Sequence, residues 1–230
     1  MKRETHIAIT RKVCSNFCTQ DQTEEIANAS VLPDSEPDYI RGSRVSHHGR
    51  EAIDMAFDYL KSARKAYLRD DRRYTKYLGK ALHYIQDYSV SFEDMKTHNE
   101  REKDIAYLPV PEEAISTGLN EICTPGKVKK IIYEAQQKKI PEEIMFQATY
   151  LSTIAVKAVF KPDKPSDLGK KALIVHLIHV LLSLLVFFAF ALVYFKPYTL
   201  ILVLILGIVG DKIDKKWIKK WELERDWFKP

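Results

Sequence analysis

The spacing of apolar residues along most of the chain constrains its fold more than any other feature of the sequence. In the stretch REAIDMAFDYLKSARKAYL (50–68), apolar side chains recur at intervals of three and four positions, with charged residues between them. This interval matches the turn of an amphipathic helix, and the sequence shows no alternating pattern typical of a strand. Another stretch, residues 141–160, begins with Pro141 and two acids, as helices often do. We therefore expect an all-α domain over residues 1–160, interrupted by an ordered loop at NASVLPDSEPDYIRGS (28–43).

A long apolar run follows this domain. Residues 161–171 form a hydrophilic linker that contains Pro, and the run from Ala172 to Phe195 carries no formal charge. Because about 20 apolar residues suffice to span a bilayer as a helix, this run predicts a transmembrane helix. A second, shorter apolar run ends at Gly210, so residues 172–210 are predicted to form a transmembrane helical hairpin. A re-entrant or interfacial second segment is the alternative.

The residues that flank the hairpin predict its orientation. The chain has a formal net charge of +5, and basic residues gather on both flanks of the hairpin rather than at its tip. By the positive-inside bias, the helical domain and the tail are expected to face the cytoplasm, which predicts a multi-pass membrane protein with two spans. The tail, residues 211–230, contains all three Trp among its lysines, and we expect it to lie at the lipid headgroups. His176 and His179, near the cytoplasmic end of the first run, are expected to be structural.

Two pairs of His and acid mark the segment YLGKALHYIQDYSVSFEDMKTHNERE (77–102). His83 precedes Asp87 by four positions, and His98 precedes Glu102 by four positions. Four residues make about one helical turn, so the members of each pair lie side by side on one face. Neutral imidazoles beside carboxylates are typical ligands of divalent transition metals. The alternative is a buried, hydrogen-bonded His–Asp pair together with a surface ion pair.

Further donors of the same kind lie upstream. His6 belongs to the first predicted helix, LPDSEPD supplies Asp34 and Asp38 from the loop, and SHH supplies His47 and His48 at the start of the next helix. These are more ligands than one tetrahedral ion can use. They therefore predict a cluster of about two or three zinc ions that share a carboxylate. Such clusters usually activate water and bind a phosphate group during hydrolysis.

The order of these motifs resembles the zinc-dependent phospholipase C family, to which the fungal zinc-dependent single-strand nucleases are related. The resemblance extends over residues 5–105, and LGKALHYIQD (78–87) is its most specific part. It implies an all-α, phospholipase C-like bundle in which the loop Asp positions the attacking water. The implied ligands of the first ion are Asp34, His47 or His48, His83 and Asp87. Asp87 would bridge to a second ion bound by His6, and a third ion would be bound by His98 and Glu102.

The sequence departs from the family pattern at two positions. In the family the backbone amine of the N-terminal residue binds metal, whereas here residues 1–5 precede His6. The family also places another His shortly after the HxxxD motif, where this chain has Glu93. Glu93 is expected either to replace that His as a harder ligand or to be a surface acid.

These features predict a membrane-anchored, metal-dependent phosphodiesterase. Tethering to membrane lipids would raise the local concentration of a phospholipid or another lipid-linked phosphodiester. A zinc-dependent nuclease is one alternative, but the sequence shows no basic stripe that could follow a nucleic-acid strand. A non-enzymatic membrane protein with a structural metal site is another. The surplus of ligands and the lack of Cys among them argue against that alternative.

Overall fold

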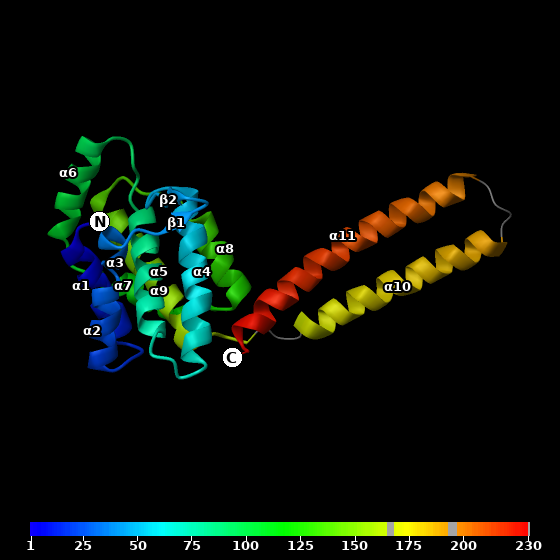
Figure 1. Cartoon of the computed structure of the whole chain (residues 1–230), viewed down its shortest axis with the longest axis horizontal. Helices are drawn as coiled ribbons and strands as arrows, with labels where there is room; N and C mark the ends of the chain where they lie inside the picture. Colours follow the sequence, from blue (N-terminus) through cyan, green and yellow to red (C-terminus); the bar gives the residue numbers. More distant parts are fainter. Residues whose placement is uncertain (165–167, 193–196, 230) are drawn as a thin grey trace. The chain divides into compact units, whose positions relative to one another are not determined.

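The computed structural model of the chain describes residues 1–164, 168–192 and 197–229 (Figure 1). The described part is mostly helical, which confirms the all-α class. It divides into two compact units, a first unit (Met1–Asp163) and a hairpin unit (Lys164–Phe228). Residues 165–167 of the predicted linker, residues 193–196 of the predicted hairpin and residue 230 lie outside the described part.

The first unit is built around α5 (Tyr74–Tyr88), which packs against α1, α2, α4 and α9 (Figure 1). Every residue from Leu78 to Asp87 is buried, including the polar ones, so the polar groups on this helix need partners inside the protein. The predicted helix start at Pro141 is confirmed. The other helices of this unit are α1 (Arg3–Cys14), α2 (Gln20–Ala29), α3 (Leu32–Ser35), α4 (Arg50–Tyr67), α6 (Met95–Ala106), α7 (Glu112–Asn120), α8 (Pro125–Glu134) and α9 (Pro141–Phe160).

Gly79 allows α5 to pack closely against the end of α2. A Cβ atom at this position would lie 2.5 Å from the Cβ of Ala29 and 2.6 Å from the carbonyl oxygen of Ile26. No side chain fits at these distances, so the close approach of the two helices requires glycine. Ser30 follows α2, and its carbonyl oxygen accepts a hydrogen bond from His83, one turn along α5 from Gly79. The packing of the two helices thus sets the position of this His.

Part of the segment predicted as a loop has regular structure. β1 (Tyr39–Ile40) pairs antiparallel with β2 (Ser43–Arg44). The connecting residues Arg41 and Gly42 have φ angles of 51° and 85°, as a tight hairpin turn requires. Strands this short leave no alternation in the sequence, which explains why the pattern did not predict them. Before the hairpin, α3 begins with Pro in its first turn and includes Asp34.

The orientation of α6 is fixed at its first turn. Asp94 caps the helix, and its side chain accepts hydrogen bonds from the backbone amides of Lys96 and Thr97. Among the residues of α6, only His98 and Ile105 are buried. The helix therefore turns His98 inward, with Glu102 one turn later on the same face.

The hairpin unit consists of α10 (Leu168–Leu192) and α11 (Pro197–Trp227), which lie side by side (Figure 1). Asp214 on α11 accepts hydrogen bonds from Nδ1 of His176 at 3.2 Å and from Nδ1 of His179 at 2.6 Å. Gly210, one turn before Asp214, packs against the ring of His179, where a Cβ would have no room. The two histidines of α10 therefore bind the partner helix.

The membrane localisation expected from the sequence is wrong. No helix within residues 1–164, 168–192 and 197–229 has the length and apolar character needed to cross a membrane. On α11 the apolar segment passes without a break into a charged one that begins at Asp211. The first turn of α10 includes Lys170 and Lys171, and this helix carries two His on one face. The prediction of two spans is therefore wrong, and the placement of the first unit and the tail in the cytoplasm no longer follows from it.

Candidate metal centre

Asp34, His47, His83 and Asp87 converge in the first unit, where one ligand atom from each lies within 4.8 Å of the other three. His47 Nδ1 lies 3.0 Å from both His83 Nε2 and Asp87 Oδ2, and His83 Nε2 lies 3.2 Å from Asp87 Oδ2. Asp34 Oδ1 lies 3.8 Å and 3.7 Å from the two ring nitrogens. Ligand atoms around a tetrahedral zinc are about 3.3–3.5 Å apart. This first donor group could therefore hold a metal ion after only small movements.

A hydrogen bond behind the first donor group fixes which nitrogen of His83 faces it. His83 Nδ1 donates to the carbonyl oxygen of Ser30 at 2.8 Å. In the neutral ring Nε2 then carries no proton, and its lone pair points at His47 and Asp87. Histidines that bind metals are usually held in this way by a backbone carbonyl or a carboxylate.

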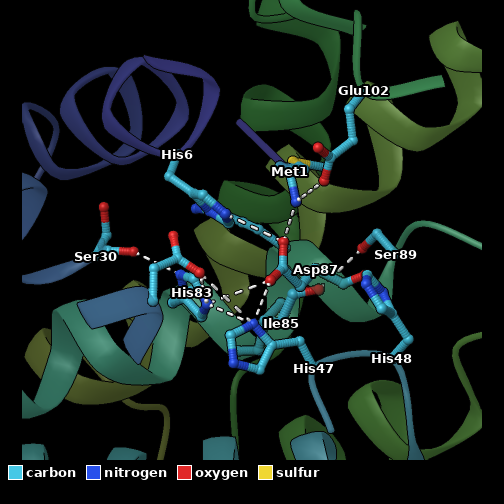
Figure 2. Close-up of polar contacts among 12 residues, drawn as sticks. Met1, His6, Ser30, His47, His48, His83, Ile85, Asp87, Ser89 and Glu102 are labelled. Carbon is cyan, nitrogen blue, oxygen red and sulfur yellow. Dashed lines mark hydrogen bonds and ion pairs between the residues drawn. The ribbon is translucent and has the colours of Figure 1, made fainter. Parts of the chain in front are cut away.

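The second carboxylate oxygen of Asp87 faces a second donor group, which consists of Met1, His6 and Glu102. Figure 2 shows Asp87 between the two groups. The amine of Met1 contacts Asp87 Oδ1 and lies 2.7 Å from Glu102 Oε1, and His6 Nε2 lies 3.1 Å from Asp87 Oδ1. Because Oδ2 belongs to the first donor group and Oδ1 to the second, Asp87 could bridge two ions if each group held one.

The contacts of His6 favour a cation in the second donor group. Gln86 donates its amide hydrogens to Thr10 Oγ1 at 3.3 Å and to Ser152 Oγ at 3.1 Å, so its Oε1 must accept a hydrogen bond from His6 Nδ1 at 2.7 Å. His6 Nε2 then carries no proton. Among the described residues it has no hydrogen-bond partner, and it is buried and faces an oxygen of Asp87. Two electron-rich atoms in such contact are stabilised by a shared cation.

Burial and nearby charges give His6 and Asp87 the protonation states that bind metal. Burial lowers the pKa of His6, which keeps the ring neutral. Burial alone would raise the pKa of Asp87, but the Met1 amine and the rings of His83 and His6 outweigh it, so this pKa lies well below its ordinary value. Ionised carboxylates and neutral imidazoles are the forms that bind metals. The pKa of the Met1 amine is raised, because Asp87 and Glu102 outweigh its burial, so a metal bound there must displace a proton.

The second His–acid pair lies beside the second donor group. On α6, His98 Nε2 lies 3.0 Å from the Glu102 oxygen that also contacts the Met1 amine. His98 Nδ1 is buried and has no partner in the part of the chain that the structure describes. The ring of His48 lies 4.4 Å from that of His98, and His48 Nδ1 donates to the carbonyl oxygen of Asp87. The structure thus separates the two neighbouring histidines. His47 joins the first donor group, and His48 lies next to the α6 pair.

The structure does not bring Glu93 to the other predicted ligands. Its carboxylate is exposed and pairs with Arg101 at 3.1 Å and with Lys139 at 2.5 Å. The hydrogen bonds from Lys139 and Arg101 lower its pKa. This placement corresponds to the surface acid that the sequence left open as an alternative.

The first donor group opens to solvent beside Asp34. The side chain of Asp34 is 50% exposed, whereas that of His47 is 14% exposed and those of His83 and Asp87 are almost fully buried. A water molecule or a substrate can therefore reach the centre from the α3 side. The opening also places a carboxylate, rather than an imidazole, next to incoming solvent.

Sequence reasoning missed three groups of the centre. The Met1 amine meets Asp87 only through long-range packing, and the Ser30 carbonyl belongs to the backbone, so no residue pattern marks either. Gln86 lies within the motif LGKALHYIQD, next to Asp87, and its place there was the one available signal.

Comparison of the chain with protein-family models, with curated proteins and with solved structures found no match. The class of protein is therefore defined by the fold and the centre alone. The chain is a mostly helical protein in which two His and two Asp could hold a metal ion.

Proposed function

We propose that the first unit is a zinc-dependent phosphodiesterase, the activity that the motif resemblance to zinc-dependent phospholipase C implies. The observation that carries this proposal is the position of Asp87, whose two oxygens face two donor groups. Hydrolytic sites with two metals hold their ions about 3.5–4 Å apart, a distance that one carboxylate can bridge.

The chemistry of the donors supports zinc and an anionic substrate. Imidazole and carboxylate donors without Cys suit zinc well. Two divalent ions beside the carboxylates of Asp34, Asp87 and Glu102 would leave a net charge of about +1. An open, weakly positive centre attracts a phosphodiester, whereas a closed structural site has no position for one.

In the proposed reaction, Asp34 and His83 have different roles. Zinc bound at the centre supplies a Lewis acid that activates water and neutralises phosphate oxygens. The half-exposed carboxylate of Asp34 accepts the proton of the attacking water at the open side. His83 is held by Ser30 with its unprotonated nitrogen inward, so it keeps its place through the reaction. The substrate class, a phospholipid or another lipid-linked phosphodiester, rests on the motif resemblance.

The proposal is tested by hydrolysis of a chromogenic bis(nitrophenyl) phosphate by the full chain reconstituted with zinc. Asp34→Asn should lower kcat by about 10²–10⁴-fold, because it removes the proton acceptor. Glu93→Gln is the matched control, since Glu93 lies outside the centre, and it should leave kcat unchanged. Equal rates in the wild type and Asp34→Asn would contradict the assignment of Asp34.

Two competition measurements in the same assay test the proposed substrate class. Vesicles of phosphatidylcholine should compete with the chromogenic substrate, and single-stranded DNA should not. The opposite order of competition would identify a nuclease. A chain that binds zinc fully but shows no turnover on any phosphodiester would instead have a structural metal site.

A further inference from the structure

Asp38 lies outside both donor groups, in the segment 34–47, which we call the ligand loop. Its carboxylate accepts hydrogen bonds from two helices of the first unit. Tyr59 on α4 donates to Oδ1 at 2.6 Å, and Lys80 on α5 donates to the same oxygen at 3.2 Å. Tyr84 on α5 donates to Oδ2 at 2.9 Å. We call these four residues the Asp38 clamp.

The ion pair within the Asp38 clamp is nearly buried. The side chain of Lys80 is 8% exposed and that of Asp38 is 16% exposed. A buried ion pair is weak evidence for stability, because the loss of hydration offsets much of the attraction, but in some proteins it fixes one arrangement of the elements that it joins. The ligand loop has another ion pair with α5, between Glu36 and Lys76. Both of its side chains are exposed, so that pair should contribute little.

The Asp38 clamp lies between two ligands of the first donor group. Asp34 precedes Asp38 by four residues, and His47 follows it by nine. The carbonyl oxygen of Asp38 accepts a hydrogen bond from the amide of Val45 at 2.9 Å, so the β1–β2 hairpin closes at Asp38. A displacement of Asp38 would therefore move the backbone on both sides, towards Asp34 and towards His47.

Asp34 depends on this attachment more than His83 does. His83 is held by its hydrogen bond to Ser30. Within the part of the chain that the structure describes, the carboxylate of Asp34 accepts no hydrogen bond, and the nearest imidazole nitrogens lie 3.7 Å and 3.8 Å away. The position of Asp34 is therefore set by its backbone, which the clamp at Asp38 attaches to α4 and α5.

The Asp38 clamp also contacts the part of α5 that carries His83. Lys80 lies about one turn before His83, and Tyr84 follows it directly. The ring of Tyr84 packs edge-on against the rings of His47 and His83, with centroid distances of 5.3 Å and 5.5 Å. The hydroxyl of the same ring donates to Asp38. The clamp therefore joins the ligand loop to α5 directly beside the first donor group.

We propose that Asp38 is a positioning residue of the metal centre, and that its clamp sets where Asp34 and His47 lie relative to the ligands on α5. Asp38 binds neither the metal nor the substrate, and it acts mainly through Asp34. The positioning role rests on the metal centre of the proposed function, but it requires no phosphodiesterase activity. Loss of the clamp should weaken metal binding because Asp34 is displaced, although no ligand is removed.

The experiment is a double-mutant cycle on the zinc affinity of the metal-free full chain, measured by competition with a chromophoric chelator. Asp38→Ala should lower the affinity by about tenfold, as is usual for residues that hold a ligand in place. Asp34→Ala should lower it by at least as much, because it removes a ligand. If Asp38 acts through Asp34, then Asp38→Ala should cause little further loss in a chain that already carries Asp34→Ala.

Tyr84→Phe is a milder second variant, because it retains the ring and both charges of the clamp. It should lower zinc affinity less than Asp38→Ala does, and this loss should also disappear in the Asp34→Ala chain. Tyr133→Phe is the matched control. Its hydroxyl donates to Asp54, so it also joins two helices through a Tyr–Asp hydrogen bond, but outside the ligand loop. This control should leave zinc affinity unchanged.

The proposal is overturned if Asp38→Ala binds zinc like the wild type, or if its loss adds fully to that of Asp34→Ala. Full additivity would show a role that does not act through Asp34. If circular dichroism shows that Asp38→Ala does not fold, Tyr84→Phe decides by the same two criteria. A wild type that binds no zinc also overturns the proposal. Because the titration contains no substrate, a lack of hydrolysis would contradict the proposed function alone.

Discussion

The first unit and the hairpin unit each contain an Asp beside two histidines, yet only one of these clusters could hold a metal. In the first unit Asp87 lies 3.0 Å from His47 and 3.2 Å from His83, and in the hairpin unit Asp214 lies 3.2 Å and 2.6 Å from its two histidines. The distances are nearly the same. The difference lies in what surrounds each cluster.

In the first unit the surroundings leave lone pairs that face one space. Ser30 and Gln86 accept the Nδ1 protons of His83 and His6, and the other nitrogens face the carboxylate of Asp87. In the hairpin unit both Nδ1 atoms converge on one oxygen of Asp214, and the side chain of His176 is 56% exposed. That single oxygen accepts both Nδ1–H hydrogen bonds, so the lone pairs of the two rings point away from the carboxylate. The residues that hydrogen-bond to the ligands, and so orient their lone pairs, thus matter as much for a metal site as the ligands do.

Replacing the central Asp of each cluster by Asn should give the largest difference in zinc affinity between the two units. Asp87→Asn should lower zinc affinity by at least about a hundredfold, because it removes a ligand from both donor groups. Asp214→Asn should leave zinc affinity unchanged, since its histidines face a hydrogen bond and not an ion. Titration of the metal-free full chain with zinc against a chromophoric chelator measures both. Similar losses in the two variants would mean that the hairpin cluster also binds metal.

A change that moves the Ser30 carbonyl, which holds the ligand His83, should lower zinc affinity less than the loss of a ligand does. Gly79→Ala should destabilise the first unit by about 1–3 kcal/mol, because the new Cβ would overlap α2. It should also lower zinc affinity by about tenfold, since the Ser30 carbonyl moves away from His83.

Gly118→Ala is the control for this prediction. A Cβ there would lie 2.7 Å from Thr153 Cβ, so it should destabilise the unit by a similar amount through α7 and α9. It should not change zinc affinity once the protein is folded. Denaturation followed by circular dichroism, together with zinc titration, separates the two effects. Equal zinc affinities in the two variants would show that the position of Ser30 has no influence.

Acid should lower the stability of the hairpin unit. This effect should be smaller than those of Asp87→Asn and Gly79→Ala. The hydrogen bond from His179 is the largest cause of the lowered pKa of folded Asp214. The stabilisation from this carboxylate is therefore complete above the ordinary Asp pKa of about 3.9 and is lost as the pH falls through the lowered, folded-state pKa. All three Trp lie on α11, so Trp fluorescence reports this unit alone.

Two variants sharpen the acid prediction. Asp214→Asn should abolish the acid-dependent change in fluorescence. Asp211→Asn, one turn earlier on α11 and paired with Lys215, should retain it. An acid transition that survives Asp214→Asn would have another origin.

The sequence predicted the elements of the first unit better than it predicted the details of the centre. The periodicity of residues 50–68 and the Pro at position 141 come from local chemistry, and α4 and α9 follow them closely. The pairing of His83 with Asp87 also follows from helical spacing alone. The approach of Met1 to Asp87 depends on how α1, α5 and α6 pack, which no local pattern contains.

The same limit explains one alternative that the sequence left open and one prediction that was wrong. Glu93 was a candidate ligand because of its position after the HxxxD motif, but Arg101 and Lys139 hold it at the surface. The long apolar run after Lys171 predicted a span from its composition. The sequence shows the charged residues after Gly210, but not that they continue the same helix without a break, nor the His–Asp contacts between the two helices.

The central claim is that Asp87 joins two metal-binding groups, and the zinc content of the full chain tests it most directly. The wild type and His6→Ala are each reconstituted with zinc, desalted, digested and measured by elemental mass spectrometry. The wild type should hold about two or three zinc ions per chain, and His6→Ala should lose one and keep the ion of the first donor group. A wild type with one ion or none, or a variant with the same zinc content as the wild type, would contradict the shared centre.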